Sequence, residues 1–305
     1  MLRNLLALLV LAGLLRGATV ITRPAPDRIH VEIDGGPFAD FCFGTDTPKP
    51  YLYPLRTADG TVVTRGFPME KIAGETTTDQ HQRAVFLGYS SVNGFDFWKN
   101  EFSYRDPKAG RVETVRVDTV KDGISGIFRW LSPQGEPILE EARGMTFRGD
   151  GALRIVDVEL ALRALTDTTF GDSKDGAFGV RLAEPLIEKN GGVITNSAGG
   201  RGMKQTWGKP AAWVDYSGEI AGAKAGVALF VHPESDHFPP RWHVRDYGLL
   251  AVNPFGTKAF DAEAKESITS LKKGTTIRFR YRIVVHGAIS PEKLRELYAA
   301  YAAKK

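Results

Sequence analysis

The segment Thr276–His286, TIRFRYRIVVH, decides the fold class. Apolar and charged residues alternate along it, with Ile277, Phe279, Tyr281, Ile283 and Val285 set against Arg278, Arg280 and Arg282. Successive side chains of a strand point to opposite faces of a sheet, so an alternation of period two is typical of a half-buried strand. The segment therefore predicts a strand with one face in the core and the other in solvent.

The same alternation recurs along the chain, in residues 28–34, 83–91, 111–120, 125–132, 155–165 and 226–232. Thirty-three glycines and seventeen prolines supply the turns between these segments. The pattern predicts an all-β fold, a large antiparallel sandwich of two packed sheets, and it favours a single domain over residues 18–305.

Only the C-terminus predicts a helix. Ser290 suits the N-cap, Pro291 suits the first helical position, and one apolar stripe follows, formed by Leu294, Leu297, Tyr298 and Tyr301. We expect this helix to pack across the end or the back of a sheet.

The N-terminus, MLRNLLALLVLAGLLRGATV, has a basic residue at position 3 and an apolar run over residues 5–15. This pattern predicts a secretory signal peptide at residues 1–17 and export to the periplasm or the cell exterior. An uncleaved anchor is the alternative, but the apolar run is short for a membrane span.

Composition excludes several classes of protein. The 305 residues are 42% hydrophobic and 25% charged, and no internal run of 18 or more apolar residues predicts a membrane span. Forty basic and 36 acidic residues are scattered together, which argues against a nucleic-acid partner. The single cysteine, Cys42, forms no intramolecular disulfide or thiolate metal site, and its apolar setting predicts a small buried residue.

Three long polar segments interrupt the strands, at residues 49–83, 174–218 and 232–248. The first predicts a cleft, because its many charged groups cannot all be buried unless they pair or face water. It carries His81 and Arg83 two residues apart, with Glu75 and Asp79 before them. A histidine beside an arginine suits acid/base chemistry on an anionic substrate. The alternative is a turn in which both side chains bind loop carbonyls.

The second segment offers Asn196 and Trp207 as substrate contacts, and its GGRG at residues 199–202 lacks the context of a phosphate-binding loop. Indoles such as Trp98, Trp207, Trp213 and Trp242 are platforms for sugar rings when exposed and core residues otherwise.

The third segment, HPESDHFPPRWHVRDYG, contains three of the six histidines. His232 follows a predicted strand, and the spacing matches no zinc signature. Alternation in RWHVRDYG places Trp242 and Val244 on one side of a strand and His243 and Arg245 on the other.

Six stretches together resemble a bacterial family labelled PmoA-like, after a methane oxygenase subunit: residues 49–71, 74–98, 174–186, 196–200, 207–218 and 232–256. The resemblance implies a domain of unknown function, similar in shape to the galactose-mutarotase-like sandwiches and typical of bacteria that degrade complex glycans. The namesake subunit is a membrane protein of apolar helices. The strands predicted here disfavour a true membrane methane oxygenase.

One motif departs from the family pattern. Its members commonly read Asp-His-Pro-His, then His or Gln, then Arg, where this chain has TDQHQR at residues 78–83. His81 and Arg83 match, whereas Asp79 replaces the earlier histidine. The resemblance implies an oxygen ligand at Asp79 if the family binds a metal there, and altered activity if that histidine donates a proton.

The leading hypothesis is an exported carbohydrate-active enzyme acting on a sugar or uronic-acid unit by epimerisation, elimination or hydrolysis. His81 and His243 would transfer protons and Arg83 and Arg245 would stabilise charge, while substrate contacts would come from His232, Glu75, Asn196, Trp207, Trp242 and Tyr247. The alternatives are a non-catalytic glycan-binding module and a metal-dependent lyase or redox site, whose divalent ion would take ligands from His81, His232, His243 and Asp79. The oligomeric state stays open.

Overall fold

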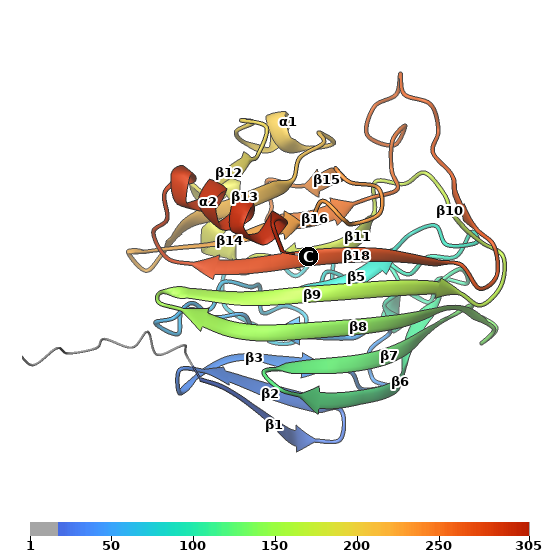
Figure 1. The fold of residues 1–305 in the computed structure, drawn as a ribbon, viewed down its shortest axis with the longest axis horizontal. Coiled ribbons are helices and arrows are strands. Elements are labelled where there is room, and N and C mark those ends of the chain that lie inside the picture. Colours follow the sequence, from blue (N-terminus) through green and yellow to red (C-terminus); the bar gives the residue numbers. More distant parts are fainter. Residues whose placement is uncertain (1–17, 305) are drawn as a thin grey trace, which may run out of the picture.

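Two eight-stranded antiparallel sheets lie face to face in the computed structural model of the protein, with a short two-stranded sheet beside them (Figure 1). The structure describes residues 18–304; the predicted signal peptide, residues 1–17, and Lys305 lie outside the described residues. The arrangement confirms the predicted all-β antiparallel sandwich with a C-terminal helix.

The first sheet has the strand order β1 (Thr19–Ala25), β2 (Arg28–Ile33), β3 (Gly36–Cys42), β4 (Tyr51–Tyr53), β5 (Val85–Tyr89), β11 (Gly176–Arg181), β16 (Leu249–Asn253) and β15 (Arg241–Val244). The second sheet has the order β12 (Val193–Asn196), β13 (Trp213–Ile220), β14 (Ala223–Val231), β18 (Thr276–His286), β9 (Leu153–Ala164), β8 (Pro137–Asp150), β7 (Gly123–Leu131) and β6 (Arg111–Val120).

The remaining elements are short. Strands β10 (Thr168–Phe170) and β17 (Thr269–Leu271) form the small sheet. The helices are α1 (Met203–Thr206), α2 (Pro291–Ala302) and three single-turn 3-10 helices, η1 (Phe102–Tyr104), η2 (Glu184–Leu186) and η3 (Glu188–Asn190). No helix among residues 18–304 has the length and apolar content needed to cross a bilayer.

The predicted strand at Thr276–His286 is confirmed over its full length as β18, which pairs with β9 and β14. All five of its alternating apolar side chains enter the core between the two sheets. Burial of each such side chain stabilises the fold by about 1.5–3 kcal/mol relative to exposure. The core between the sheets is therefore what fixes which face of each strand points inward.

The alternating arginines of β18 predict a second face that is exposed to solvent. Part of that face is buried instead, because α2 lies on it (Figure 1). Arg282 is 3% exposed and pairs with Asp157 of β9, with Nη2 donating to Oδ2 at 2.8 Å. Its guanidinium lies 4.3 Å from the ring centroid of Tyr301 in α2. The predicted cap is confirmed, since the Ser290 side chain accepts a hydrogen bond from the Lys293 amide.

A buried histidine also lies on this outer face. His286 Nε2 donates to Asp215 at 2.8 Å and Nδ1 donates to the Gly287 carbonyl at 2.7 Å, so both ring nitrogens act as donors. Gly226 lies between the two strands that carry the pair, and a Cβ there would come within 2.6 Å of the imidazole. Burial lowers the pKa of His286, but the hydrogen bond and the charge of Asp215 raise it more, so the net shift is upward.

We expect this pair to make stability fall at alkaline pH. A histidine whose folded pKa is raised stabilises the fold fully below the unfolded pKa of about 6.5, and that contribution is lost as the pH rises through the folded value. Urea unfolding between pH 6 and 9 should show the loss in the wild type and a smaller loss in His286→Gln. The exposed His237 serves as the control, so His237→Gln should keep the wild-type profile. An unchanged alkaline decrease in His286→Gln would contradict the charged pair.

Candidate functional site

The outer face of the first sheet, which α2 does not cover, carries the candidate site. One row of paired positions crosses it, formed by Cys42, Tyr51, Phe86, Gly179, Ala251 and His243. Cys42 is only half-buried there, less than its apolar setting predicts. A Cβ at Gly179 would lie 3.4 Å from the Trp98 ring, so the glycine lets Trp98 rest directly on the sheet. Trp98 itself is fully buried.

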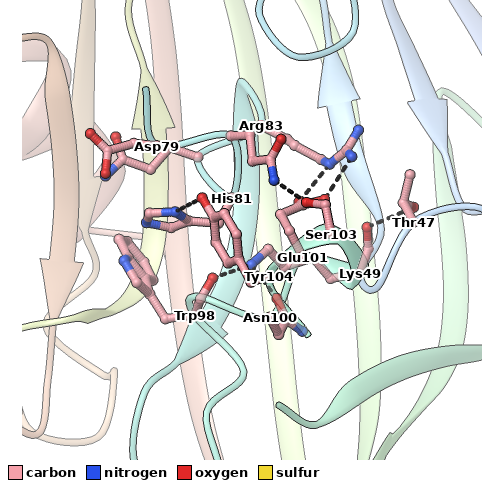
Figure 2. A network of polar contacts seen from close by, with 12 residues as sticks. Thr47, Lys49, Asp79, His81, Arg83, Trp98, Asn100, Glu101, Ser103 and Tyr104 are labelled. Atoms are coloured by element: carbon pink, nitrogen blue, oxygen red, sulfur yellow. Dashed lines mark hydrogen bonds and ion pairs between the residues drawn. The ribbon is translucent and has the colours of Figure 1, made fainter. Parts of the chain in front are cut away.

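Trp98 is the common neighbour of the two histidines that the sequence selects for proton transfer. The centroid of its ring system lies 6.2 Å from that of His81 and 6.3 Å from that of His243. Figure 2 shows His81 beside the Trp98 indole, with Tyr104 in front of it. The structure therefore brings His81 and His243 together at one indole, although 162 positions separate them in the sequence.

His81 is a neutral imidazole closed off by Tyr104. Its Nδ1 lies 3.1 Å from the Tyr104 hydroxyl, and Nε2 has no hydrogen-bond partner in the described chain. Burial and, to a smaller degree, the charge of Lys49 lower the pKa of His81 to about 2. At neutral pH the ring is neutral and can accept a hydrogen bond from a ligand or donate its N–H to one.

His243 sits at the edge of the same cluster, among charged groups. Its Nδ1 lies 3.6 Å from the carboxylate of Asp175, which also contacts Lys174 at 2.8 Å and Lys99 at 3.4 Å. Burial lowers the pKa of His243 to about 4, although the charge of Asp175 opposes the shift. Asp175 thus favours a proton on Nδ1 and leaves Nε2 to act as a base.

Lys49 anchors the segment that carries Trp98. Its ammonium is buried and donates to the carbonyls of Phe97 and Trp98 and, at 2.6 Å, to Oδ1 of Asn100 (Figure 2). Burial lowers the pKa of Lys49 to about 7. Three acceptors match the three N–H groups of the charged form, so this one side chain fixes the backbone on both sides of Trp98.

Arg83 is paired rather than free. Its Nε and Nη2 donate to the two carboxylate oxygens of Glu101, both at 2.8 Å, and its guanidinium lies 5.4 Å from the ring centroid of Tyr51 (Figure 2). The pair ties the approach to β5 to the start of η1, directly next to Tyr104. Arg83 therefore holds the cover of His81 in place, and its charge is compensated by Glu101.

The sequence predicts that the charged side chains of residues 49–83 face a cleft. Several of them are instead bound by backbone groups of the segment itself. The buried Arg65 donates to the carbonyls of Thr76, Thr78, Asp79 and Gln82. The Glu75 carboxylate accepts hydrogen bonds from the amides of Gly66 and Phe67. Backbone groups thus bind both side chains, although Nε of Arg65 has no partner within the described residues. Glu75 is a turn residue rather than a substrate contact.

Two other predicted contacts lie away from the cluster. The His232 ring packs on Tyr301 of α2 at 5.1 Å, on the outer face of the second sheet. The core and both sheets therefore separate it from His81 and His243. Trp242 is fully buried in the core, where its Nε1 donates to the Ala211 carbonyl. The alternation had placed Trp242 opposite His243, and the structure confirms that placement.

The second polar segment contributes one residue near the site and one structural residue. Trp207 packs edge-to-face on Phe260 at 5.2 Å, and the same phenyl ring lies 6.4 Å from His243. Asn196 is buried and its Oδ1 accepts from the amides of Ala198 and Gly200. Asn196 therefore shapes a turn, whereas Trp207 borders the cluster.

The predicted metal set of His81, His232, His243 and Asp79 is not assembled. No group of three or more His, Cys, Asp or Glu side chains within residues 18–304 is arranged to hold a metal ion. The physical reason is the separation of His232 by the core, which leaves no third histidine at Trp98.

A model of a family of unknown function, DUF6807, matches residues 28–299. The chain belongs to this family. The resemblance also implied a domain of unknown function, and the match agrees with it in that respect. The match does not show the methane oxygenase label. No curated protein matches the sequence.

Solved structures give only distant likenesses. A galactose mutarotase related enzyme from Lactobacillus acidophilus is 12% identical, with 88% of this chain and 97% of that chain covered and a TM-score of 0.36. A GH36 alpha-galactosidase from Geobacillus stearothermophilus is 10% identical, with 89% of this chain and 40% of that chain covered and a TM-score of 0.39. At these scores we draw no functional argument from either protein.

Several residues of the site in this family member could not be predicted from the neighbouring sequence. The partners of Lys49 lie 48, 49 and 51 positions further along the chain. Asp175, just before β11, meets His243 of β15 across strand β16, and Tyr104 reaches His81 from a 3-10 turn. Of the residues that surround the two histidines, the sequence singles out only Trp98, as one of several indoles whose burial it leaves open.

Replacing Lys49 with methionine should destabilise the protein by about 2–4 kcal/mol, because three buried acceptors would lose their donor. Urea unfolding measures the change. The exposed Lys209 provides a matched control, and Lys209→Met should stay within about 0.5 kcal/mol of the wild type. Equal stabilities of the two variants would show that Lys49 is not an anchor.

The buried neutral state of His243 predicts a loss of stability in acid. Because the folded pKa of His243 is about 4, below its unfolded value, the unfolded state binds more protons as the pH falls below about 6.5. The free energy of unfolding should therefore drop between pH 6.5 and 4. His243→Asn should reduce this drop, whereas His237→Asn should leave it unchanged. A steeper acid dependence in His243→Asn would overturn the neutral assignment.

Proposed function

We propose that the protein is an exported carbohydrate-active enzyme in which His81 and His243 transfer protons on a sugar or uronic-acid unit. One observation carries the proposal. Two buried neutral imidazoles lie beside the same indole, and His81 Nε2 and Trp98 Nε1 have no hydrogen-bond partner within the described residues. Unpaired buried polar atoms cost free energy, and a ligand rich in hydroxyl groups would satisfy them.

The two histidines suit different roles. Asp175 lies on the Nδ1 side of His243 and would stabilise the imidazolium that forms when Nε2 accepts a proton from the substrate. The Tyr104 hydroxyl can donate to Nδ1 of His81, which places the ring proton on Nε2. A neutral imidazole N–H of this kind polarises a carbonyl or ring oxygen without carrying charge itself. We therefore assign His243 as the base and His81 as the neutral donor.

Entry of a substrate requires the cover over His81 to move. Tyr104 is 40% exposed, whereas His81 beneath it is 1% exposed. The Arg83–Glu101 pair holds the start of η1 down, so breaking that pair is the step that would uncover His81. Closure of such a segment around a substrate excludes water and strengthens the electrostatic interactions inside.

The proposal is tested by proton NMR in D2O, with wild-type protein incubated with hexoses, hexuronic acids and their disaccharides. Epimerisation would exchange a ring C–H signal, elimination would create an olefinic proton, and hydrolysis would release monosaccharides. We expect turnover in the wild type and a loss of about 100-fold or more in His81→Asn and His243→Asn.

His237→Asn is the control and should turn over like the wild type. Each variant's melting temperature is measured alongside, so that a folding defect is not taken for a catalytic one. Sugar binding without any turnover in the wild type would overturn the enzyme and support the glycan-binding module. Full turnover in both histidine variants would overturn the assignment of roles.

A further inference from the structure

We infer that the substrate is an acid whose carboxylate binds between Arg181 and Arg245, beside Tyr247. This inference rests on the proposed function, because it names the class of ligand for the same outer face. It is carried by two guanidinium groups that converge on one aromatic ring and have no carboxylate partner in residues 18–304.

Strand register places the two arginines in one row. Arg181 of β11 pairs with Leu249 of β16, and the amide of Arg245, just after β15, donates to the Leu249 carbonyl. Both guanidinium groups contact the ring of Tyr247, at 4.5 Å from Arg181 and 5.5 Å from Arg245. This row lies next to the one that contains His243, two residues away along the chain, or about 7 Å along a strand.

These arginines differ from the other buried arginines in their partners. The buried Arg143, Arg154 and Arg282 each pair with a carboxylate, as does the half-buried Arg83, whereas the buried Arg65 binds backbone carbonyls. Arg181 instead donates to the neutral side chains of Gln82, at 2.8 Å, and Thr76. A buried cation normally has a paired anion, because desolvation of an unpaired charge is costly.

Arg245 has still fewer contacts. No ion pair or hydrogen bond of its half-buried guanidinium is found in the described part of the chain, and its Nε is buried without a partner. The Nε of Arg181 is likewise unpaired, in a side chain that is 1% exposed. Each of the two guanidinium groups therefore has an Nε–H donor that is free to bind a ligand.

No neighbouring acid of the described chain forms an ion pair with either arginine. Burial lowers the pKa of Arg181, and Asp79 and Glu184 lie near enough to oppose that shift. Glu184 nevertheless accepts from Thr76, and Asp246 pairs with Lys189 at 3.7 Å. The guanidinium of Arg65 binds only backbone carbonyls and adds another positive charge. Burial and the nearby charge of Arg181 lower the pKa of Arg65. Three guanidinium groups thus face two nearby carboxylates that form no ion pair with them, and an incoming anion would pair with the remaining positive charge.

A carboxylate is the anion that fits best. The planar guanidinium presents N–H groups that match a carboxylate in a bidentate fashion. A sugar acid would place its carboxylate at Arg181 and Arg245 and its ring toward His243 and Trp98. Phosphate and sulfate esters share the anionic chemistry, so the experiment separates them from carboxylates.

Isothermal titration calorimetry of the full chain tests the inference with glucuronate and galacturonate, and with glucose and galactose as their neutral counterparts. Glucose 6-phosphate and inorganic sulfate are the other anions. We expect at least one uronate to bind about tenfold or more tightly than its hexose and than either of the other anions. Equal binding of uronate and hexose, or tighter binding of the phosphate or sulfate, would overturn the carboxylate assignment.

Arg245→Gln is the decisive variant, because Arg245 is half-buried and its side chain makes no hydrogen bond whose loss would unfold the protein. The uronate preference should disappear in Arg245→Gln and persist in Arg116→Gln, a control at an exposed arginine of β6. A preference that survives in Arg245→Gln would overturn the site.

Failure of this inference and failure of the proposed function are distinguishable. Uronate binding that depends on Arg245, without any proton transfer, would leave the acid site standing and overturn the enzyme. Turnover of neutral hexoses that is independent of Arg245 would leave the enzyme standing and overturn the acid site.

Discussion

The buried ammonium of Lys49 is the interaction on which the candidate site depends. It binds the backbone on both sides of Trp98 and so holds the indole flat on the outer face of the first sheet. His81 and His243 take their common position from that indole. An ammonium can hold three acceptors at once, which no apolar side chain of similar length could do. One desolvated charge thus orders a site that no single strand could build.

Charge pairing separates several buried and half-buried arginines by their consequences. Arg83 pairs with Glu101 and so holds η1 against the sheet, whereas Arg282 pairs with Asp157 across two strands and contacts the Tyr301 ring of α2. Arg181 and Arg245 have no such partner, although burial makes an unpaired guanidinium costly. Proteins tolerate such a cost where binding needs it. The outer face of the first sheet therefore combines neutral bases with uncompensated positive charge.

Part of the site could be predicted from the sequence. Alternation in RWHVRDYG placed His243 and Arg245 opposite Trp242, and the structure agrees because Trp242 fills the core. The three-histidine set failed because His232 ends a strand of the other sheet, and sequence order says nothing about which sheet a strand joins. Glu75 and Asn196 were selected for their polarity, yet backbone amides of their own turns occupy their carboxylate and amide oxygens.

The sequence by itself determined the elements: the alternation at Thr276–His286 set strand β18 and its core face, and Ser290 with Pro291 set the start of α2. These are local properties, fixed by backbone geometry and side chains a few positions apart. Only the tertiary structure decided that α2 covers the arginine face of β18, and that Lys49, His81 and His243 meet at Trp98. Those contacts join residues dozens of positions apart, and their free energy appears only when both sheets have formed.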